Sequence, residues 1–335
     1  MADYFHYIEA GVMSFLLTLI ISPFVISFMK KEKVKQTILH YVENHSGKAG
    51  TPTMGGIIFI LSITIISYIF FVGSKTLAGI SLLIFMGYGL TGFLDDFIKF
   101  RFKRNLGLRA YQKFLFQLAI AIVVAVFAYK NEFVGSQLYV PFSNITIDVG
   151  FWIIPIIVIV FLACTNSVNL TDGLDGLASS TTMCYTISIV AIMFVMLSTR
   201  LAGQNEIYLM EYKNLIILSF VVVGALLCFL TFNCFPAKIF MGDTGSLALG
   251  AFVACIGVFT KMTLYIPILG IMFVLSTLSV MIQVAYYKLT KKRVFLMAPL
   301  HHHFEKKGVH EVRIAVVYSV ITMMIGLVVL LVEVL

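Results

Sequence analysis

Charged residues are scarce in this sequence. Only 12% of the 335 residues are Asp, Glu, Lys or Arg, whereas 60% are hydrophobic. Soluble domains typically carry about a quarter charged residues, so this composition excludes an ordinary water-soluble globule. Cysteine is also rare: the chain has five, and none is in a C-x-x-C pair, which argues against a thiolate metal site. No connection between hydrophobic runs is long enough for a soluble domain, so residues 1–335 are predicted to form a single polytopic membrane domain.

Ten long runs of the sequence contain no charged residue type at all. A helix needs about 20 apolar residues to cross a hydrocarbon core of ~30 Å. Backbone amides in lipid must also be satisfied within the segment, which favours helices. We therefore predict an all-α integral membrane protein with ten transmembrane helices. The runs are residues 10–29, 54–74, 76–94, 114–129, 149–171, 176–199, 214–237, 244–260, 262–287 and 314–332.

The distribution of positive charge predicts the orientation. Of the 24 lysines and arginines, 19 lie in the connections that follow the odd-numbered runs. The positive-inside rule places these connections in the cytoplasm and both termini outside. Asp3 and Glu9 precede the first run without any basic residue, unlike the start of a cleavable signal peptide, so this helix should remain.

Two further patterns concern the connections and the third run. The stretch "GSQLYVPFSNITIDVG" between the fourth and fifth runs predicts a short periplasmic β-hairpin. The stretch "GYGLTG" at 87–92 matches a dinucleotide motif but has no strand before it, so its glycines are expected to allow close helix packing. The basic residues are spread over three separate loops without a nucleic-acid motif, so they favour contact with inner-membrane lipid and no nucleic acid.

Five aspartates lie in the cytoplasmic connections or at their borders. They are Asp95 and Asp96 in "LDDFIK", Asp172 and Asp175 in "NLTDGLDG", and Asp243 in "MGDTGS". Ionisable groups at a membrane boundary are functional candidates, because they are costly unless solvated, paired or metal-bound. Oxygen ligands without thiolates favour Mg²⁺ over zinc, and Mg²⁺ fills its remaining positions with water and phosphate oxygens. The cluster therefore indicates phosphate chemistry.

Simpler explanations exist for several of these residues. Lys99 lies one helical turn from Asp95 and Asp96 and could form ordinary surface ion pairs with them. However, adjacent acids are unfavourable at the negative end of a helix dipole, which favours a functional role. Asp172 and Asp243 each precede a predicted helix and could simply cap it.

Three consecutive histidines, His301, His302 and His303, lie inside the chain. Consecutive side chains diverge, so they cannot all bind one ion. Donation to phosphate or proton transfer is therefore a better explanation than a zinc site. A solvated polar loop is the alternative.

Five stretches in order resemble one family. They are "TPTMGG" (51–56), "LDDFIK" (94–99), "NLTDGLDGLA" (169–178), "FNCFPAKIFMGDTGS" (232–246) and "PLHHHFE" (299–305). Together they resemble the polyprenyl-phosphate N-acetylhexosamine-1-phosphate transferase superfamily, and the "HHHFE" form is similar to its muramoyl-pentapeptide branch.

The resemblance implies ten membrane helices with a cytoplasmic active site in the bacterial inner membrane, a homodimer, and Mg²⁺ as cofactor. It also implies transfer of phospho-MurNAc-pentapeptide from UDP-MurNAc-pentapeptide to undecaprenyl phosphate, giving lipid I and UMP. The same chemistry with UDP-GlcNAc is an alternative. A transporter is a more distant one, because transport residues are expected near the midplane whereas the acids here gather at one face.

The resemblance also assigns roles residue by residue. Asp243 would be the direct Mg²⁺ ligand, Asp95 and Asp96 would act on the lipid phosphate or the metal, and Phe240 would stack on uracil. The implied catalytic residues are Asp95, Asp96, Asp172, Lys99, Lys113, His301, His302 and His303. The implied substrate-binding residues are Lys48, Thr53, Asn169, Gly173, Leu174, Asp175, Asn233 and Phe240.

Overall fold

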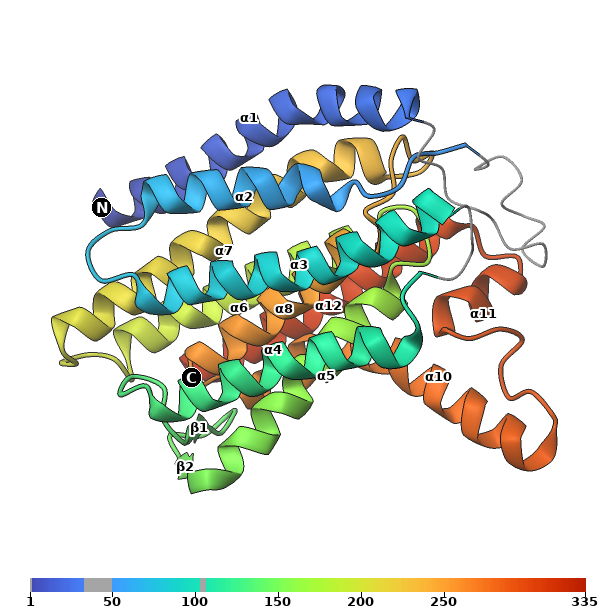
Figure 1. Ribbon diagram of the computed structural model, residues 1–335. Helices are drawn as coiled ribbons and strands as arrows, with labels where there is room; N and C mark the ends of the chain where they lie inside the picture. The colour runs from blue at the N-terminus through green and yellow to red at the C-terminus, as the bar shows by residue number, and fades with distance from the viewer. Residues whose placement is uncertain (1, 33–49, 103–106) are drawn as a thin grey trace.

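The chain folds into a bundle of long helices that run side by side (Figure 1). The structure is a computed structural model that describes residues 2–32, 50–102 and 107–335. Within these residues, nine helices are long and apolar enough to cross a membrane. The helices are α1 (Ala2–Lys31), α2 (Gly56–Phe70), α3 (Thr76–Phe102), α4 (Ala110–Lys130), α5 (Ile153–Thr171), α6 (Leu177–Ser198), α7 (Glu206–Asn233), α8 (Gly242–Phe259), α9 (Ile266–Leu269), α10 (Ile271–Thr290), α11 (Leu300–Lys306) and α12 (Glu311–Val334).

Helix α8 lies at the centre of the bundle. Every residue from Thr244 to Phe259 is buried. Helices α3 and α5 pack against it, and its small residues let their backbones come close. The N-terminal end of this central helix lies next to the C-terminal end of α3, where the acidic residues lie.

Helix α2 differs from the prediction for residues 54–74. It has 15 residues, which span about 22 Å and fall short of the ~30 Å core. The chain leaves the helix because the buried side chain of Asn214 on α7 binds the backbone of the following segment. Its amide nitrogen donates to the carbonyls of Val72 and Ser74, and its oxygen accepts from the Val72 amide.

The ninth predicted run, residues 262–287, is not one continuous helix. It begins with the 3₁₀ turn η3 (Thr263–Tyr265) and the short helix α9, and Gly270 then leaves helical geometry before α10 starts. Helix α10 diverges from the bundle, and α11 with the histidines lies outside the long helices (Figure 1).

Two short strands connect α4 to α5. Strand β1 (Gln137–Tyr139) pairs antiparallel with β2 (Thr146–Asp148), and the 3₁₀ turn η2 (Gly150–Trp152) follows. This pair lies at the end of the bundle where both chain termini lie, whereas α11 lies at the other end (Figure 1).

Candidate active site between α3 and α8

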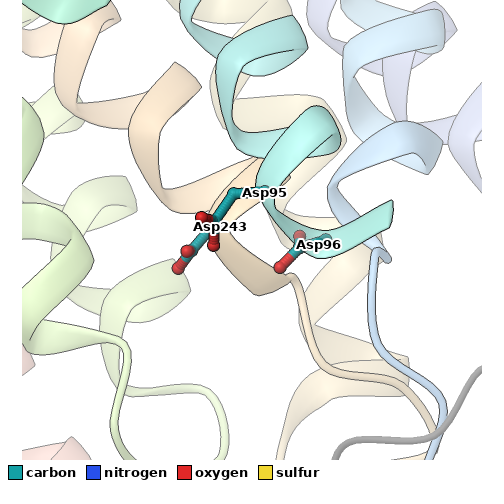
Figure 2. A group of neighbouring side chains, drawn as sticks. All are labelled: Asp95, Asp96 and Asp243. Atoms are coloured by element: carbon teal, nitrogen blue, oxygen red, sulfur yellow. The ribbon is translucent and has the colours of Figure 1, made fainter. Parts of the chain in front are cut away.

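Three carboxylates from two distant segments meet where α3 ends and α8 begins (Figure 2). One oxygen from each of Asp95, Asp96 and Asp243 lies within 4.8 Å of the others. The side chains of Asp95 and Asp96 are buried, so they do not form ordinary surface ion pairs. The close approach of α3 to α8 depends on Gly92, because a Cβ at this position would overlap the backbone carbonyl of Asp243. The expectation that this glycine allows close helix packing is confirmed.

Two lysines bind the cluster. The Lys99 Nζ lies 2.6 Å from Asp95 Oδ2 and donates to Asp243 Oδ2 at 2.9 Å. Lys113, on α4, donates to the same Asp243 oxygen at 3.0 Å. When all three carboxylates are ionised, the two ammonium groups leave one negative charge. The cluster can therefore accept a further cation.

Neutral groups fix the positions of the carboxylates. Asn169, near the end of α5, donates to Asp243 Oδ1 at 2.7 Å and to the Ser246 hydroxyl at 2.8 Å. Asp96 Oδ2 accepts from the backbone amide of Thr244 at 2.9 Å and from its hydroxyl at 2.7 Å. An amide in the first turn of α8 is thus bound by Asp96.

The first aspartate of "NLTDGLDG" does not cap a helix N-terminus. Asp172 occupies the C-cap of α5, so the N-cap explanation for it was wrong. Burial raises its pKa well above the ordinary value, and the neighbouring carboxylates of Asp243, Asp96 and Asp175 raise it further. A nearby cation would stabilise the ionised form of this carboxyl group.

The capping explanation also fails for Asp243. The N-cap of α8 is Met241, which makes no side-chain cap hydrogen bond, and Asp243 lies inside the first turn, where its oxygens accept from Lys99, Lys113 and Asn169. Its carboxylate therefore serves the cluster.

Two of the predicted substrate-binding residues contact the loop between α7 and α8. Asp175 is buried and accepts from the Ala237 amide at 2.9 Å. Asn233 accepts from the Ser179 hydroxyl at 2.7 Å and donates to the Ile239 carbonyl at 3.0 Å. Both side chains therefore hold the loop between α7 and α8 in place.

That loop also contacts the segment that precedes α2. Phe240 is partly buried, and its backbone amide donates to the Pro52 carbonyl at 2.9 Å. Thr53 lies close by, since its hydroxyl would be 2.9 Å from a Cβ placed on Gly242. Lys48 lies outside the described residues.

The remaining two predicted binding residues face α11 and the apolar core. A Cβ on Gly173 would overlap the ring of His301, so the imidazole rests directly on this glycine. Leu174 is buried in a small apolar cluster with Met272 and Tyr318. The Leu174 side chain therefore contributes to packing between these elements.

The three consecutive histidines have different surroundings, as expected. His301 is fully buried, and neither ring nitrogen has a hydrogen-bond partner among the described residues. His302 Nδ1 lies 2.8 Å from Glu305 Oε2. His303 Nδ1 accepts from the Leu296 amide at 3.1 Å. The three rings therefore do not converge on one ion.

Acidification should destabilise the protein through His301. Burial lowers the pKa of this imidazole to about 3 from the ordinary 6.5. Below pH ~6.5 the unfolded chain binds more protons at this histidine than the folded chain does. The free energy of unfolding therefore decreases as the pH is lowered, by up to about 1.4 kcal/mol per pH unit. We expect the melting temperature of the purified protein to drop more steeply from pH ~7 to ~5 than that of His301→Gln. The control is His310→Gln, at an exposed histidine, which should keep the pH dependence of the native protein. An equal pH dependence of the melting temperature in the native protein and His301→Gln would contradict this prediction, and so would an equally reduced dependence in His310→Gln.

The donor set fits a divalent cation. The group of side chains that could hold a metal ion, as found among the described residues, consists of three aspartates and contains no Cys or His. Oxygen ligands of this kind suit Mg²⁺, which commonly takes one or two carboxylates and completes its coordination with water and phosphate. Asp95, Asp96 and Asp243 are the residues that would hold it.

Several site residues were missing from the sequence prediction. Ser246 anchors Asn169, Glu305 contacts His302, and the Leu108 amide donates to Asp95 Oδ1 at 2.8 Å. A hydroxyl one turn after Asp243 was the available signal for Ser246. The Leu108 contact has no comparable signal, because a backbone amide is present at nearly every position.

Comparisons with known proteins identify the family of this chain. The family model described as "Glycosyl transferase family 4" matches residues 77–261, and "Phospho-N-acetylmuramoyl-pentapeptide-transferase signature 1" matches residues 48–60. A protein named "Phospho-N-acetylmuramoyl-pentapeptide-transferase" from Clostridioides difficile (strain 630) is 43% identical, covering 94% of each chain. Proteins of the same name from Clostridium botulinum (strain Alaska E43 / Type E3) and Clostridium perfringens (strain 13 / Type A) are 42% and 44% identical, covering 95% and 94% of this chain and 94% and 95% of theirs. The chain belongs to the phospho-N-acetylmuramoyl-pentapeptide-transferase family.

Proposed function

We propose that this protein transfers phospho-MurNAc-pentapeptide from UDP-MurNAc-pentapeptide to undecaprenyl phosphate, giving lipid I and UMP. The observation that carries the proposal is the group of Asp95, Asp96 and Asp243 with Lys99 and Lys113, at one end of a helix bundle. Membership of the family, whose members carry the transferase name, supports it.

The chemistry requires two anions to approach each other. An oxygen of undecaprenyl phosphate attacks the phosphorus that bears the sugar, a new P–O bond forms, and the P–O bond to UMP breaks. A bound Mg²⁺ supplies charge neutralisation for the phosphates and the leaving UMP. Lys99 and Lys113 add fixed positive charge beside Asp243. Asn169 keeps the Asp243 carboxylate oriented through its 2.7 Å hydrogen bond.

We assign the other predicted residues to the substrates as the family resemblance implies. Asp172 lies near the diphosphate, and the histidines of α11 meet phosphate or sugar. The uridine is surrounded by Lys48, Gly173, Leu174, Asp175, Asn233 and Phe240, and we also assign Thr53 and Asn169 to substrate binding. Two observations support part of this assignment: Thr53 and Asp96 both lie beside Gly242, and Phe240 contacts the segment that carries Thr53 through Pro52.

We also infer the arrangement in the membrane. Helix α2 crosses together with the segment that follows it, whose backbone groups Asn214 binds. With the nine longer helices, the chain then spans the bacterial inner membrane ten times, and homodimers form there. The basic connections and the acidic cluster face the cytoplasm, while both termini and the β1–β2 pair face outside. The position of the two termini at one end of the bundle supports this topology (Figure 1).

Release of UMP tests the proposed reaction. Purified protein with undecaprenyl phosphate, Mg²⁺ and UDP-MurNAc-pentapeptide should release UMP. EDTA should reduce the rate by at least about a hundredfold, because the phosphates lose their neutralising cation, and added Mg²⁺ should restore it. UDP-GlcNAc offered in place of the pentapeptide substrate should release little UMP.

Other outcomes of this assay would point elsewhere. Faster turnover of UDP-GlcNAc would assign the protein to the alternative sugar, and solute flux into vesicles without UMP release would favour a transporter. Exchange of labelled UMP into the nucleotide sugar without undecaprenyl phosphate would indicate a two-step route through an aspartyl phosphate.

A further inference from the structure

A polar hollow lies at the opposite end of the bundle from the carboxylates. Its volume is about 470 Å³, within the usual range of ~300–1,000 Å³ for small-ligand sites. Its walls come from the strands β1 and β2 and the turn between them, the α6–α7 connection, the start of α7 and the connection after α8. They include Gln137, Tyr139, Arg200, Tyr208 and Lys261.

The fold places this hollow near the opposite surface of the membrane. Asp243 lies in the first turn of α8 and Lys261 follows its last turn, so the 18 residues of α8 separate them by about 27 Å. The chain's single tryptophan, Trp152, is 72% exposed in η2, directly after the strand pair. Exposed aromatic residues of this kind are typical of the headgroup region of a bilayer.

The hollow is positively charged. Arg200 and Lys261 both line it, and none of its described lining residues is acidic. Two carboxylates of the same region are bound elsewhere: Asp148 accepts from the Ser136 hydroxyl at 2.6 Å, and Glu333 accepts from the Tyr265 hydroxyl at 2.6 Å. The charge of the lining therefore favours an anionic ligand.

Polar groups of the hollow lack partners. The Tyr208 side chain is more than nine-tenths buried, and its hydroxyl has no hydrogen bond of ordinary geometry in the described part of the chain, although the Tyr139 side chain lies close to it. The Arg200 guanidinium binds the Ser143 carbonyl and lies over the Tyr139 ring, yet its Nη1 is buried without a partner there. Buried donors of this kind are rare in folded proteins unless a ligand or water satisfies them.

Lys261 offers a second positive charge. Its Nζ donates to Gln137 Oε1 at 3.1 Å and lies 5.7 Å from the centre of the Tyr208 ring. Burial lowers the pKa of Lys261, because desolvation disfavours the ammonium form, and a bound anion would offset this effect.

We propose that this hollow binds a phosphate group carried by the headgroup of an anionic phospholipid in the leaflet opposite the carboxylate cluster. Arg200 and Lys261 contact the phosphate, and the Tyr208 hydroxyl donates to it. Phosphate suits this site because its several oxygens accept charge-assisted hydrogen bonds from more than one donor at once. The inference does not depend on the transferase reaction.

Native mass spectrometry of the delipidated full chain tests the site. The protein should retain phosphatidylglycerol in preference to phosphatidylcholine. Arg200→Gln and Lys261→Gln should each weaken phosphatidylglycerol binding by about tenfold, and Tyr208→Phe by about threefold. Lys130→Gln, at an exposed lysine that ends α4 and does not line the hollow, is the matched control and should bind as the native protein does.

A thermal-shift arm distinguishes the source of the phosphate. Phosphatidylglycerol should raise the melting temperature of the native protein but not of Lys261→Gln, whereas inorganic phosphate should raise neither. Equal stabilisation by inorganic phosphate would keep the anion site but overturn the lipid as its source. No preference for phosphatidylglycerol, or an equal loss in Lys130→Gln, would overturn the proposal. Should Arg200→Gln fail to fold because the strand pair loses its anchor, Lys261→Gln and Tyr208→Phe still decide.

Discussion

Asp243→Asn is expected to reduce UMP release by about a thousandfold. This side chain is the junction of the cluster, since its oxygens accept from Lys99, Lys113 and Asn169. Asparagine keeps the shape but removes the negative charge, so the cation site is weakened and the two ammonium groups lose their common carboxylate. Removal of one charge-stabilising group from an active site typically costs ~10²–10³ in rate.

The measurement is the initial rate of UMP release over a range of Mg²⁺ concentrations. A weakened cation site predicts that the variant needs more Mg²⁺ for half-maximal rate, which a purely structural defect would not produce. Asp148→Asn on β2 is the control, because its exposed carboxylate lies at the other end of the bundle, and its rate should stay within about twofold. A variant Asp243→Asn with more than a tenth of native activity would refute the role given to this residue.

Gly92→Ala is expected to destabilise the protein and to abolish most activity at the same time. The added Cβ would overlap the Asp243 carbonyl, and a backbone atom cannot rotate away as a side chain can. Helices α3 and α8 must therefore separate where the carboxylates meet. Overpacking of this kind typically costs about 1–3 kcal/mol, and the displaced carboxylates should lower the rate further.

The same helix provides the control for this prediction. A Cβ on Gly79 would meet nothing within 4 Å, so Gly79→Ala gains the helix propensity of alanine, up to ~1 kcal/mol, without a clash. Melting in detergent should therefore show a loss of stability for Gly92→Ala and none for Gly79→Ala. Equal melting temperatures for the two variants would show that α3 and α8 tolerate separation at this point.

The positions of the helices were largely predictable from the sequence because long apolar runs have few alternatives in a membrane. Two runs were misjudged for physical reasons that lie outside the runs themselves. Asn214 on α7 draws the segment after Phe70 out of α2. Gly270 interrupts the ninth run, and hydrophobicity alone does not distinguish a continuous helix from a broken one.

The composition of the carboxylate cluster was partly predictable. Asp95, Asp96 and Asp243 stood out because acids are costly at a membrane boundary, and the alternation of spans placed them on one face. The contacts of Asn233 and the surroundings of Asp172 were not predictable, because they depend on residues far away in the sequence. Asn233 braces a loop through Ser179 and Ile239, and no spacing rule connects such residues.

The burial of α8 changes how this helix meets the bilayer. Its mean hydropathy is 1.5 and 89% of its residues are buried, whereas an 18-residue stretch of α7 has a mean hydropathy of 2.9 and is 67% buried. A helix surrounded by protein has little contact with lipid. It therefore tolerates glycine, serine and threonine better than a helix on the outside of the bundle does. The helix that carries Asp243 is therefore held in the membrane more by its helical neighbours than by its own hydrophobicity. Its sequence can consequently include the polar residues that the carboxylate cluster needs.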